Sequence, residues 1–380
     1  MFRSFFWGGF ECATGLNAFR QPIDMIHATG HDVRVVEDYC LLREAGLRVA
    51  REAVRWPLVD LGNGRYDFSS LDPMLSAAER MGVQLVFDLF HYGYPAGADP
   101  FHPDFALRFA DYCRAVAEYV VPFGQGSHAF TPVNEPSYFA WAGGDAALFA
   151  PHARERSYEL KVALAKCAIA GIDAIRSVLP EARIVNVDPV CRVVAPAGRP
   201  DLEEEARHYN DTVVFQSLDM IAGRLHPELG GSMRHLDVVG LNYYWTNQWE
   251  IGWAGHPLGA EDPRALSVCD LLRLAHDRYG CDLVLTETAH VGDARAPWLD
   301  SVADEAACAL AEGIPLRGVC LYPVLGMPEW HAPDVWARMG LWDLDSDLRR
   351  VPHGPSLDAL SRAQRRIGDS AHTGPLRAML

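Results

Sequence analysis

Lysine is almost absent from this chain of 380 residues: Lys161 and Lys166 are the only two, and both fall within one helical pattern. Barrel enzymes that form a Schiff base with a carbonyl substrate require a lysine, which in a barrel is expected at the end of a strand. The sequence therefore excludes that chemistry.

Long apolar runs and paired cysteines are also missing. No apolar run approaches the roughly 20 residues that span a bilayer, and the aromatic opening 2–10 is too short for a signal peptide. The nine cysteines include no Cys-x-x-Cys pair, and most fall in apolar patterns: Cys12, Cys40, Cys113, Cys167, Cys191, Cys269, Cys281, Cys308 and Cys320. We expect buried free thiols in a reducing, cytoplasmic setting.

Net positive charge is missing as well, since 34 basic and 50 acidic residues give 34 − 50 = −16. Such a chain repels nucleic-acid phosphate and anionic membranes, so neither is an expected partner. His27 and His31 are four residues apart but have no glutamate beside them, which argues against a metal site. Trp7-Gly8-Gly9-Phe10 does not supply the Gly-x-Gly-x-x-Gly turn of dinucleotide-binding proteins, and we expect no cofactor.

What the chain does contain is a regular alternation of strand and helix patterns. Apolar strand patterns occur at 5–10, 47–56, 83–90, 129–134, 183–187, 236–241, 283–287 and 319–322. Helical patterns occur at 35–45, 71–81, 103–123, 158–178, 201–222, 268–279, 303–311 and 355–365. Eight such units predict an α/β protein, a single (β/α)8 TIM barrel over residues 1–380, within the roughly 200 to 400 residues of such barrels.

Two of these strands end in a glutamate. Ala129–Glu135 closes on Asn134-Glu135-Pro136, where proline stops the ladder, and Leu283–Glu287 closes on Thr286-Glu287. The carboxyl ends of barrel strands form one rim, so we expect the two carboxyl groups to meet there. A pair of carboxyl groups is what glycoside hydrolysis requires.

Other polar residues fall at the same predicted rim. They are Arg51, His91, Asn134, Asn242 and Tyr244. Any one of them has an ordinary structural explanation, as a hydrogen-bonded core residue or a turn residue. Together with Glu135 and Glu287 they lie at the ends of five predicted strands, and seven such residues favour a functional site.

These motifs resemble family 1 of the glycoside hydrolases, which are retaining β-glycosidases on a (β/α)8 barrel. The likeness spans about residues 5 to 345 and consists of an ordered set of short stretches: Phe6-Trp7-Gly8, Arg51 to Trp56, Phe90-His91, Asn134-Glu135-Pro136, Gly240 to Tyr244, Thr286-Glu287, Tyr322 and Glu329-Trp330.

The resemblance implies a role for each matched residue. Glu135 would be the general acid/base and Glu287 the nucleophile, with Arg51, Asn242 and Tyr244 supporting the nucleophile. His91, Asn134, Tyr322, Glu329 and Trp330 would bind the sugar. The two carboxyl groups are then expected about 5 to 5.5 Å apart.

The chain also departs from the family. The sugar-binding glutamine of the family falls on Gly15, with Glu11 and Asn17 as candidates to replace it. The stacking tryptophan is Tyr322, and the residues after the nucleophile are Thr288-Ala289. These departures leave the identity of the sugar undetermined.

The residues therefore predict a retaining β-glycosidase that acts on a small β-glycoside without metal or cofactor. Two alternatives remain open. A transglycosylase would use the same two glutamates with another acceptor, and a sugar-binding barrel would have no activity. The sequence does not indicate the aglycone or the oligomeric state.

Overall fold

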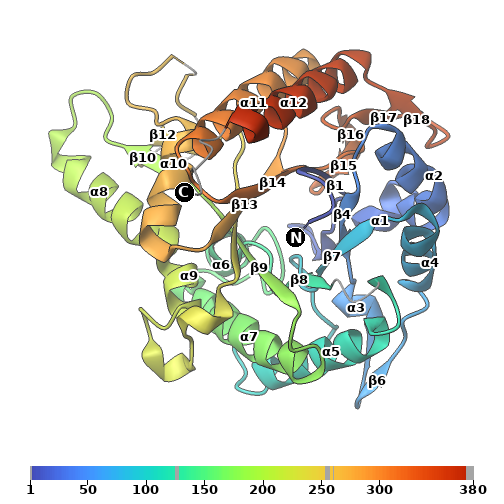
Figure 1. The fold of residues 1–380 in the computed structure, drawn as a ribbon. Coiled ribbons are helices and arrows are strands. Elements are labelled where there is room, and N and C mark those ends of the chain that lie inside the picture. The colour runs from blue at the N-terminus through green and yellow to red at the C-terminus, as the bar shows by residue number, and fades with distance from the viewer. Residues whose placement is uncertain (1, 125–127, 253–256, 260, 374–380) are drawn as a thin grey trace, which may run out of the picture.

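The computed structural model describes residues 2–124, 128–252, 257–259 and 261–373. Eight parallel strands close into a barrel in the order β1-β14-β13-β11-β9-β8-β7-β4, and Figure 1 looks into it with the helices arranged around it. The strands are β1 (Phe6–Gly9), β4 (Val49–Ala53), β7 (Gln84–Asp88), β8 (Ala129–Thr131), β9 (Arg183–Pro189), β11 (Val238–Asn242), β13 (Asp282–Thr288) and β14 (Leu316–Leu321). The predicted TIM barrel is confirmed.

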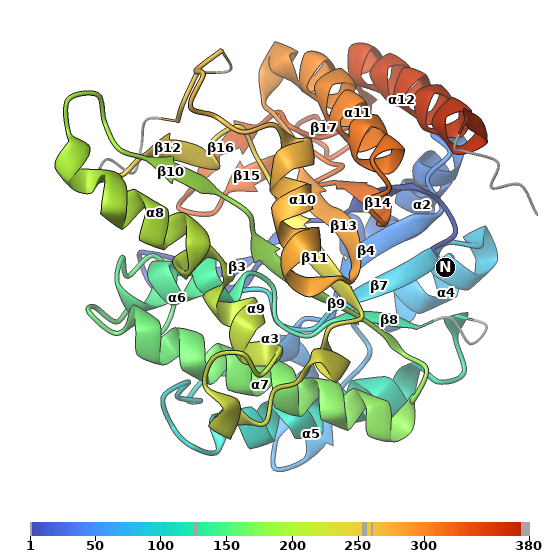
Figure 2. The same ribbon diagram turned by 60° about the vertical axis from the view of Figure 1, so that its left-hand side comes forward.

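Helices cover the outside of the barrel, as the turned view in Figure 2 shows. The longer ones are α2 (His31–Glu44), α4 (Asp72–Met81), α5 (Phe105–Val120), α6 (Pro136–Gly144), α7 (Ser157–Val178), α8 (Glu203–Asp211), α10 (Val268–Tyr279), α11 (Arg295–Ala311) and α12 (Gly354–Thr373). Short ones are α1 (Met25–Ala28), α3 (Trp56–Val59), α9 (Gln216–Ile221), η2 (Pro200–Leu202), η3 (Val213–Phe215), η4 (Pro227–Leu229), η5 (Met233–His235) and η6 (Gly292–Ala294).

Small two-stranded sheets lie in the segments that connect the main strands and helices. They pair β2 (Thr14–Leu16) with β3 (Pro22–Asp24), β5 (Asp60–Gly62) with β6 (Arg65–Tyr66), β10 (Arg192–Val194) with β12 (Gln248–Glu250), β15 (Met327–Glu329) with β16 (Ala332–Ala337), and β17 (Trp342–Leu344) with β18 (Arg350–Pro352). The first of these sheets follows β1, and the β15–β16 hairpin follows β14.

Local sequence explains where several helices stop. Helix α4 ends at Gly82 and α10 at Gly280, both with positive φ, which lets the chain leave the helix and enter the next strand. Ser267 begins α10, because its side chain accepts a hydrogen bond from the Asp270 N–H. The barrel strands are buried throughout most of their length, so their patterns read as continuous apolar runs.

Four helix predictions differ from the structure, and one of them, 355–365, is the longer helix α12. The predicted helix 201–222 is divided into α8, η3 and α9, because the backbone leaves helical geometry at Thr212. Helices α2 and α11 begin at His31 and Arg295, four and eight residues before the predicted starts. Both first turns contain polar residues, which obscured the apolar spacing.

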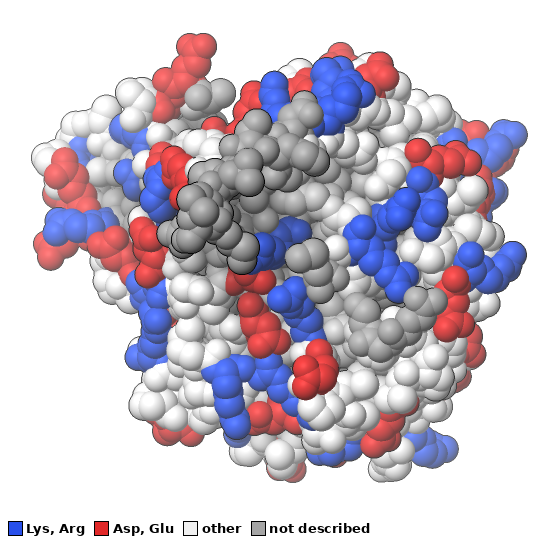
Figure 3. All heavy atoms as spheres, viewed as in Figure 1, with Lys and Arg blue, Asp and Glu red and all other residues white. Residues whose placement is uncertain are grey.

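The nine cysteines are free thiols, and most of them are buried, as expected. No helix in the described part of the chain is long and apolar enough to cross a membrane. On the face shown in Figure 3, basic and acidic side chains are intermingled.

Candidate active site

The carboxyl ends of the barrel strands bring the polar residues of the sequence analysis together. Arg51 lies within β4, Asn242 ends β11 and Glu287 lies near the end of β13. Asn134 and Glu135 follow β8, and Asn134 still pairs with Val187 of β9 as an isolated bridge. Side chains that are up to 236 residues apart in sequence therefore contact one another.

Arg51 is the centre of this cluster. Its side chain is completely buried and donates hydrogen bonds to Glu287 Oε1 at 2.5 Å, Asp88 Oδ2 at 2.6 Å and Asn134 Oδ1 at 2.5 Å. A guanidinium group has a planar set of donors, which allows it to hold three acceptors on different strands at once.

Glu287 is held by two donors. Besides Arg51, the Tyr244 hydroxyl donates to Glu287 Oε2 at 2.8 Å. Because each carboxyl oxygen accepts a hydrogen bond from a different residue, the Glu287 side chain is held in one orientation at the rim.

Glu135 has a different environment. It has φ of 45° and ψ of 59°, a conformation that costs a non-glycine residue about 1 kcal/mol or more, and it precedes Pro136 at the start of α6. Its carboxyl group accepts hydrogen bonds from the Tyr92 hydroxyl and, at 2.9 Å, from Asn242 Nδ2. Burial, together with the nearby Glu287 carboxylate, raises the pKa of Glu135 to about 8 despite these donors.

Asn242 corrects one expectation. The resemblance implied that it supports the nucleophile, but its amide nitrogen donates to Glu135. Its Oδ1 in turn accepts from Thr286 Oγ1 at 2.7 Å. Although Asn242 pairs with Glu287 in the strand register, the side chain lies against the other glutamate.

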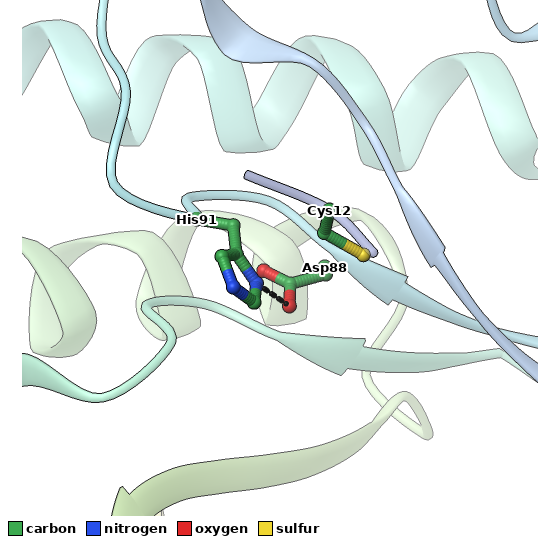
Figure 4. A group of neighbouring side chains, drawn as sticks. All are labelled: Cys12, Asp88 and His91. Atoms are coloured by element: carbon green, nitrogen blue, oxygen red, sulfur yellow. Dashed lines mark hydrogen bonds and ion pairs between the residues drawn. The ribbon is translucent and has the colours of Figure 1, made fainter. Parts of the chain in front are cut away.

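His91 lies beside Asp88 on the next part of the rim (Figure 4). His91 Nδ1 is 2.9 Å from Asp88 Oδ2, and Nε2 is 3.2 Å from Asn134 Nδ2. Burial alone would lower the pKa of His91, but Asp88, and to a smaller extent Glu11, raise it above its usual value. Asp88 itself has a lowered pKa, because Arg51 and His91 outweigh the effect of its burial.

Cys12 completes a group that has the residue types of a metal site with Asp88 and His91 (Figure 4). The residues do not fit one. Burial raises the pKa of the Cys12 thiol well above its usual value, and its Sγ lies 3.0 Å from the Phe10 carbonyl oxygen. The Asp88 carboxylate already forms an ion pair with Arg51, and the positive charge of Arg51 opposes the binding of a cation beside it.

Tyr322 directly follows β14, and its side chain is buried. A Cβ atom at Gly9 would lie 2.2 Å from the Tyr322 ring, so only glycine leaves room for it. The Tyr322 hydroxyl accepts from the Cys12 N–H at 2.9 Å, and Arg51 lies over the ring at 5.1 Å.

Trp330 and Glu329 lie farther out, at the β15–β16 hairpin. Trp330 is half-buried and packs edge-on against Tyr92 with 5.7 Å between ring centres. Its indole N–H is buried and has no acceptor among the described residues. Glu329 is exposed at the end of β15.

Two residues of this cluster, Asp88 and Tyr92, have no predicted role, and Glu11 was predicted only as one of two candidates to replace the family's sugar-binding glutamine. Asp88 did leave a signal, because it interrupts an otherwise apolar strand pattern at its end. Tyr92, in the loop that follows β7, has φ of 64° and carries the hydroxyl that contacts Glu135. Nothing in the sequence pattern distinguishes Tyr92 from a packing aromatic residue.

No protein-family model matches the sequence, and no curated protein matches it. Solved structures do match. A family 1 β-glucosidase from Thermotoga maritima superposes with a TM-score of 0.77 and 17% identity, over 96% of this chain and 98% of that one. The β-glucosidase from Thermotoga maritima in complex with deoxynojirimycin gives 0.76 and 17%, over 95% and 98%, and its complex with azafagomine gives 0.76 and 18%, over 96% and 98%. At this identity the likeness establishes the fold, and the chain has the barrel fold of these β-glucosidases.

Proposed function

We propose that this protein is a retaining β-glycosidase that belongs to family 1 of the glycoside hydrolases and acts on a small β-glycoside. The contrast between its two rim glutamates is the observation that carries the proposal. Glu287 accepts from Arg51 and Tyr244, whereas burial and the neighbouring carboxylate raise the pKa of Glu135 to about 8. Two carboxyl groups in different environments can divide acid and nucleophile roles between them.

In the first step, Glu287 attacks the anomeric carbon of the sugar. The bond from that carbon to the glycosidic oxygen breaks, and Glu135 transfers its proton to the departing oxygen. A covalent glycosyl-enzyme results, with Glu287 esterified and Glu135 ionised. The hydrogen bonds from Tyr92 and Asn242 then stabilise the Glu135 carboxylate.

In the second step, Glu135 takes a proton from water while the water oxygen attacks the anomeric carbon. The bond to Glu287 breaks, the sugar leaves with retained configuration, and both glutamates return to their starting forms. The hydrogen bonds of Arg51 and Tyr244 stabilise Glu287 as a leaving carboxylate.

The remaining rim residues provide the sugar site. By resemblance, Asn134 would bind the 2-hydroxyl, and its contacts with Arg51 and His91 fix the orientation of its amide. His91 would bind the next hydroxyl, and Tyr322 would lie under the sugar ring. The unpaired indole N–H of Trp330 is suited to donate to a hydroxyl, and Glu329 would bind the outer edge of the sugar.

The proposal is tested by trapping the intermediate. An activated 2-deoxy-2-fluoro-β-glycoside should inactivate the protein with a stoichiometric mass increase, and the label should lie on the peptide that contains Glu287. Failure to label, together with no turnover of any aryl β-glycoside in a panel of sugars, would overturn the proposal in favour of a sugar-binding barrel. Added acceptor alcohols distinguish the transglycosylase alternative, because that enzyme would form the transfer product faster than the free sugar.

A further inference from the structure

A third buried carboxyl group faces the same rim. Glu11 follows β1, its side chain is 3% exposed, and Glu11 Oε1 lies 3.7 Å from His91 Nε2. Oε1 accepts a hydrogen bond from the Ala13 N–H at 3.0 Å, whereas Oε2 has no hydrogen-bond partner among the described residues. Oε2 is not one of the fully buried unpaired atoms, so this oxygen keeps some exposure and can accept a hydrogen bond from a ligand.

The electrostatics of Glu11 point the same way. Burial raises the pKa of Glu11 to about 7, the His91 side chain opposes this rise, and Glu287 adds to it. The group is thus close enough to both His91 and the proposed nucleophile to interact with them. Its position is inside the site rather than behind it.

A side chain at position 15 cannot supply this hydrogen-bond acceptor, because the neighbouring backbone leaves no room for it. A Cβ atom at Gly15 would lie 2.9 Å from the Tyr92 carbonyl oxygen and 3.0 Å from Gly93 Cα. Asn17 is also occupied, since its Nδ2 donates to the Trp330 carbonyl and its Oδ1 accepts from the N–H groups of residues 19 and 21. Of the residues that follow β1, Glu11 alone combines a free oxygen with a contact to the rim.

We infer that Glu11 contacts the substrate and determines specificity in the sugar site, accepting hydrogen bonds from the hydroxyls at C3 and C4. This inference rests on the proposed function. The contacts run in order from Glu287 through Arg51, Asn134 and His91 to Glu11. If Asn134 serves the 2-hydroxyl beside the reacting carbon, Glu11 lies near the hydroxyls beyond it. The substrate class is then β-glycosides whose sugar has free hydroxyls at C3 and C4.

The test compares aryl β-glycosides that lack a single hydroxyl. In the wild-type protein, removal of the 3- or 4-hydroxyl should lower kcat/KM by about ten- to a hundredfold, the contribution of a hydrogen bond to a charged group. In Glu11→Ala this penalty should shrink to about threefold or less, whereas the penalty for removing the 2-hydroxyl should stay at its wild-type value. Glu11→Gln, which keeps one acceptor oxygen, should give an intermediate penalty.

Glu52→Gln is the matched control, because Glu52 is a buried carboxylate on the adjacent strand that contacts His31 and Tyr39. Its deoxy penalties should equal those of the wild type even if its stability falls. Equal lowering of kcat/KM for all substrates in Glu11→Ala, with unchanged ratios, would overturn the role of Glu11 and leave the glycosidase proposal intact. A wild-type protein that hydrolyses none of the glycosides would overturn both.

Discussion

Strand β4 carries two buried charged residues side by side, and they belong to two different networks. Arg51 contacts Glu287, Asp88 and Asn134 at the barrel rim. Glu52 contacts His31 at 2.8 Å and the Tyr39 hydroxyl at 2.7 Å, both on helix α2. Successive side chains of a strand point to opposite faces, so Arg51 faces the inside of the barrel and Glu52 faces the surrounding helices.

The two networks differ in how completely they are closed. In the outer one, His31 lies between Glu52 and Asp38, Phe10 stacks on its ring at 3.6 Å, and Arg350 binds both oxygens of Asp38. Among the described residues, only Glu52 Oε2 of the outer network is buried without a hydrogen-bond partner, whereas Arg51 Nε, Asp88 Oδ1 and the indole N–H of Trp330 are unpaired in the inner one. Buried charge in a nearly closed network holds the fold together, whereas several unpaired polar atoms at a strand rim indicate a place for a ligand.

Arg51→Lys should have the largest effect on the inner network. Lysine cannot reach Glu287, Asp88 and Asn134 together, so the nucleophile and the sugar-binding amide both lose a donor. We expect kcat/KM for an aryl β-glycoside to fall by about 10²-fold or more. Arg55→Lys, which changes an ion pair with Asp24 outside this network, is the control and should stay close to wild type. Similar activity in the two variants would contradict the role given to Arg51.

His31→Gln should affect the outer network and leave the inner one unchanged. Loss of one partner from a buried ion pair should lower the free energy of unfolding by about 3 kcal/mol. Activity per folded molecule should remain at the wild-type level. Urea unfolding and active-site labelling measure the two quantities separately, and a loss of activity without a loss of stability would show that the networks are not independent.

The pH dependence of stability should also distinguish the outer network from the inner one. Burial opposes protonation of His31, but Glu52 and Asp38 raise its pKa from 6.5 to about 9. The stabilisation from His31 is therefore complete below pH 6.5 and is lost as the pH rises through 9. The difference in unfolding free energy between wild type and His31→Gln should shrink over that interval, and a constant difference would refute the linkage. The raised pKa values of Glu11 and Glu135 act on both proteins alike and cancel.

The pH dependence of activity should report Glu135. This residue must be protonated to act as an acid, so kcat/KM should fall by about tenfold per pH unit as the pH rises above about 8. A dinitrophenyl leaving group departs without a proton, so the first step no longer needs the acid. With this substrate the decrease of kcat/KM at high pH should be absent. If it persists with that substrate, the group that titrates is not the acid.

Glu329→Gln should give the smallest effect, because this side chain is exposed at the end of β15. By resemblance it binds hydroxyls far from the breaking bond, so the preference between sugars epimeric at C4 should change by about two- to tenfold. An equal reduction for both epimers would argue against a role in sugar choice. Asp334→Asn, on the same hairpin, is the matched control.

Much of this arrangement follows from local sequence. The eight strand patterns predict the barrel, and Glu135 and Glu287 can be placed at its rim because apolar runs end there. What the pattern does not contain is which rim side chain contacts which. Asn242 pairs with Glu287 in register yet contacts Glu135, because all these side chains converge within hydrogen-bonding distance and rotamers decide the partners. Tyr92 was not predicted as a partner of Glu135, because it lies in an irregular segment, and for the same reason the sequence left Glu11 and Asn17 as equal candidates for one role.

The central claim is that Glu287 is the nucleophile and Glu135 the acid/base, and product configuration after azide rescue tests it most directly. In Glu287→Gly, azide should enter the space left by the carboxylate and give the α-glycosyl azide from a β-glycoside, with inversion. In Glu135→Ala, the glycosyl-enzyme should still form from an activated aryl glycoside, and azide should attack it from the opposite face to give the β-glycosyl azide, with retention. Proton NMR of the two products distinguishes them. The β-azide from Glu287→Gly and the α-azide from Glu135→Ala would contradict the account and exchange the two roles.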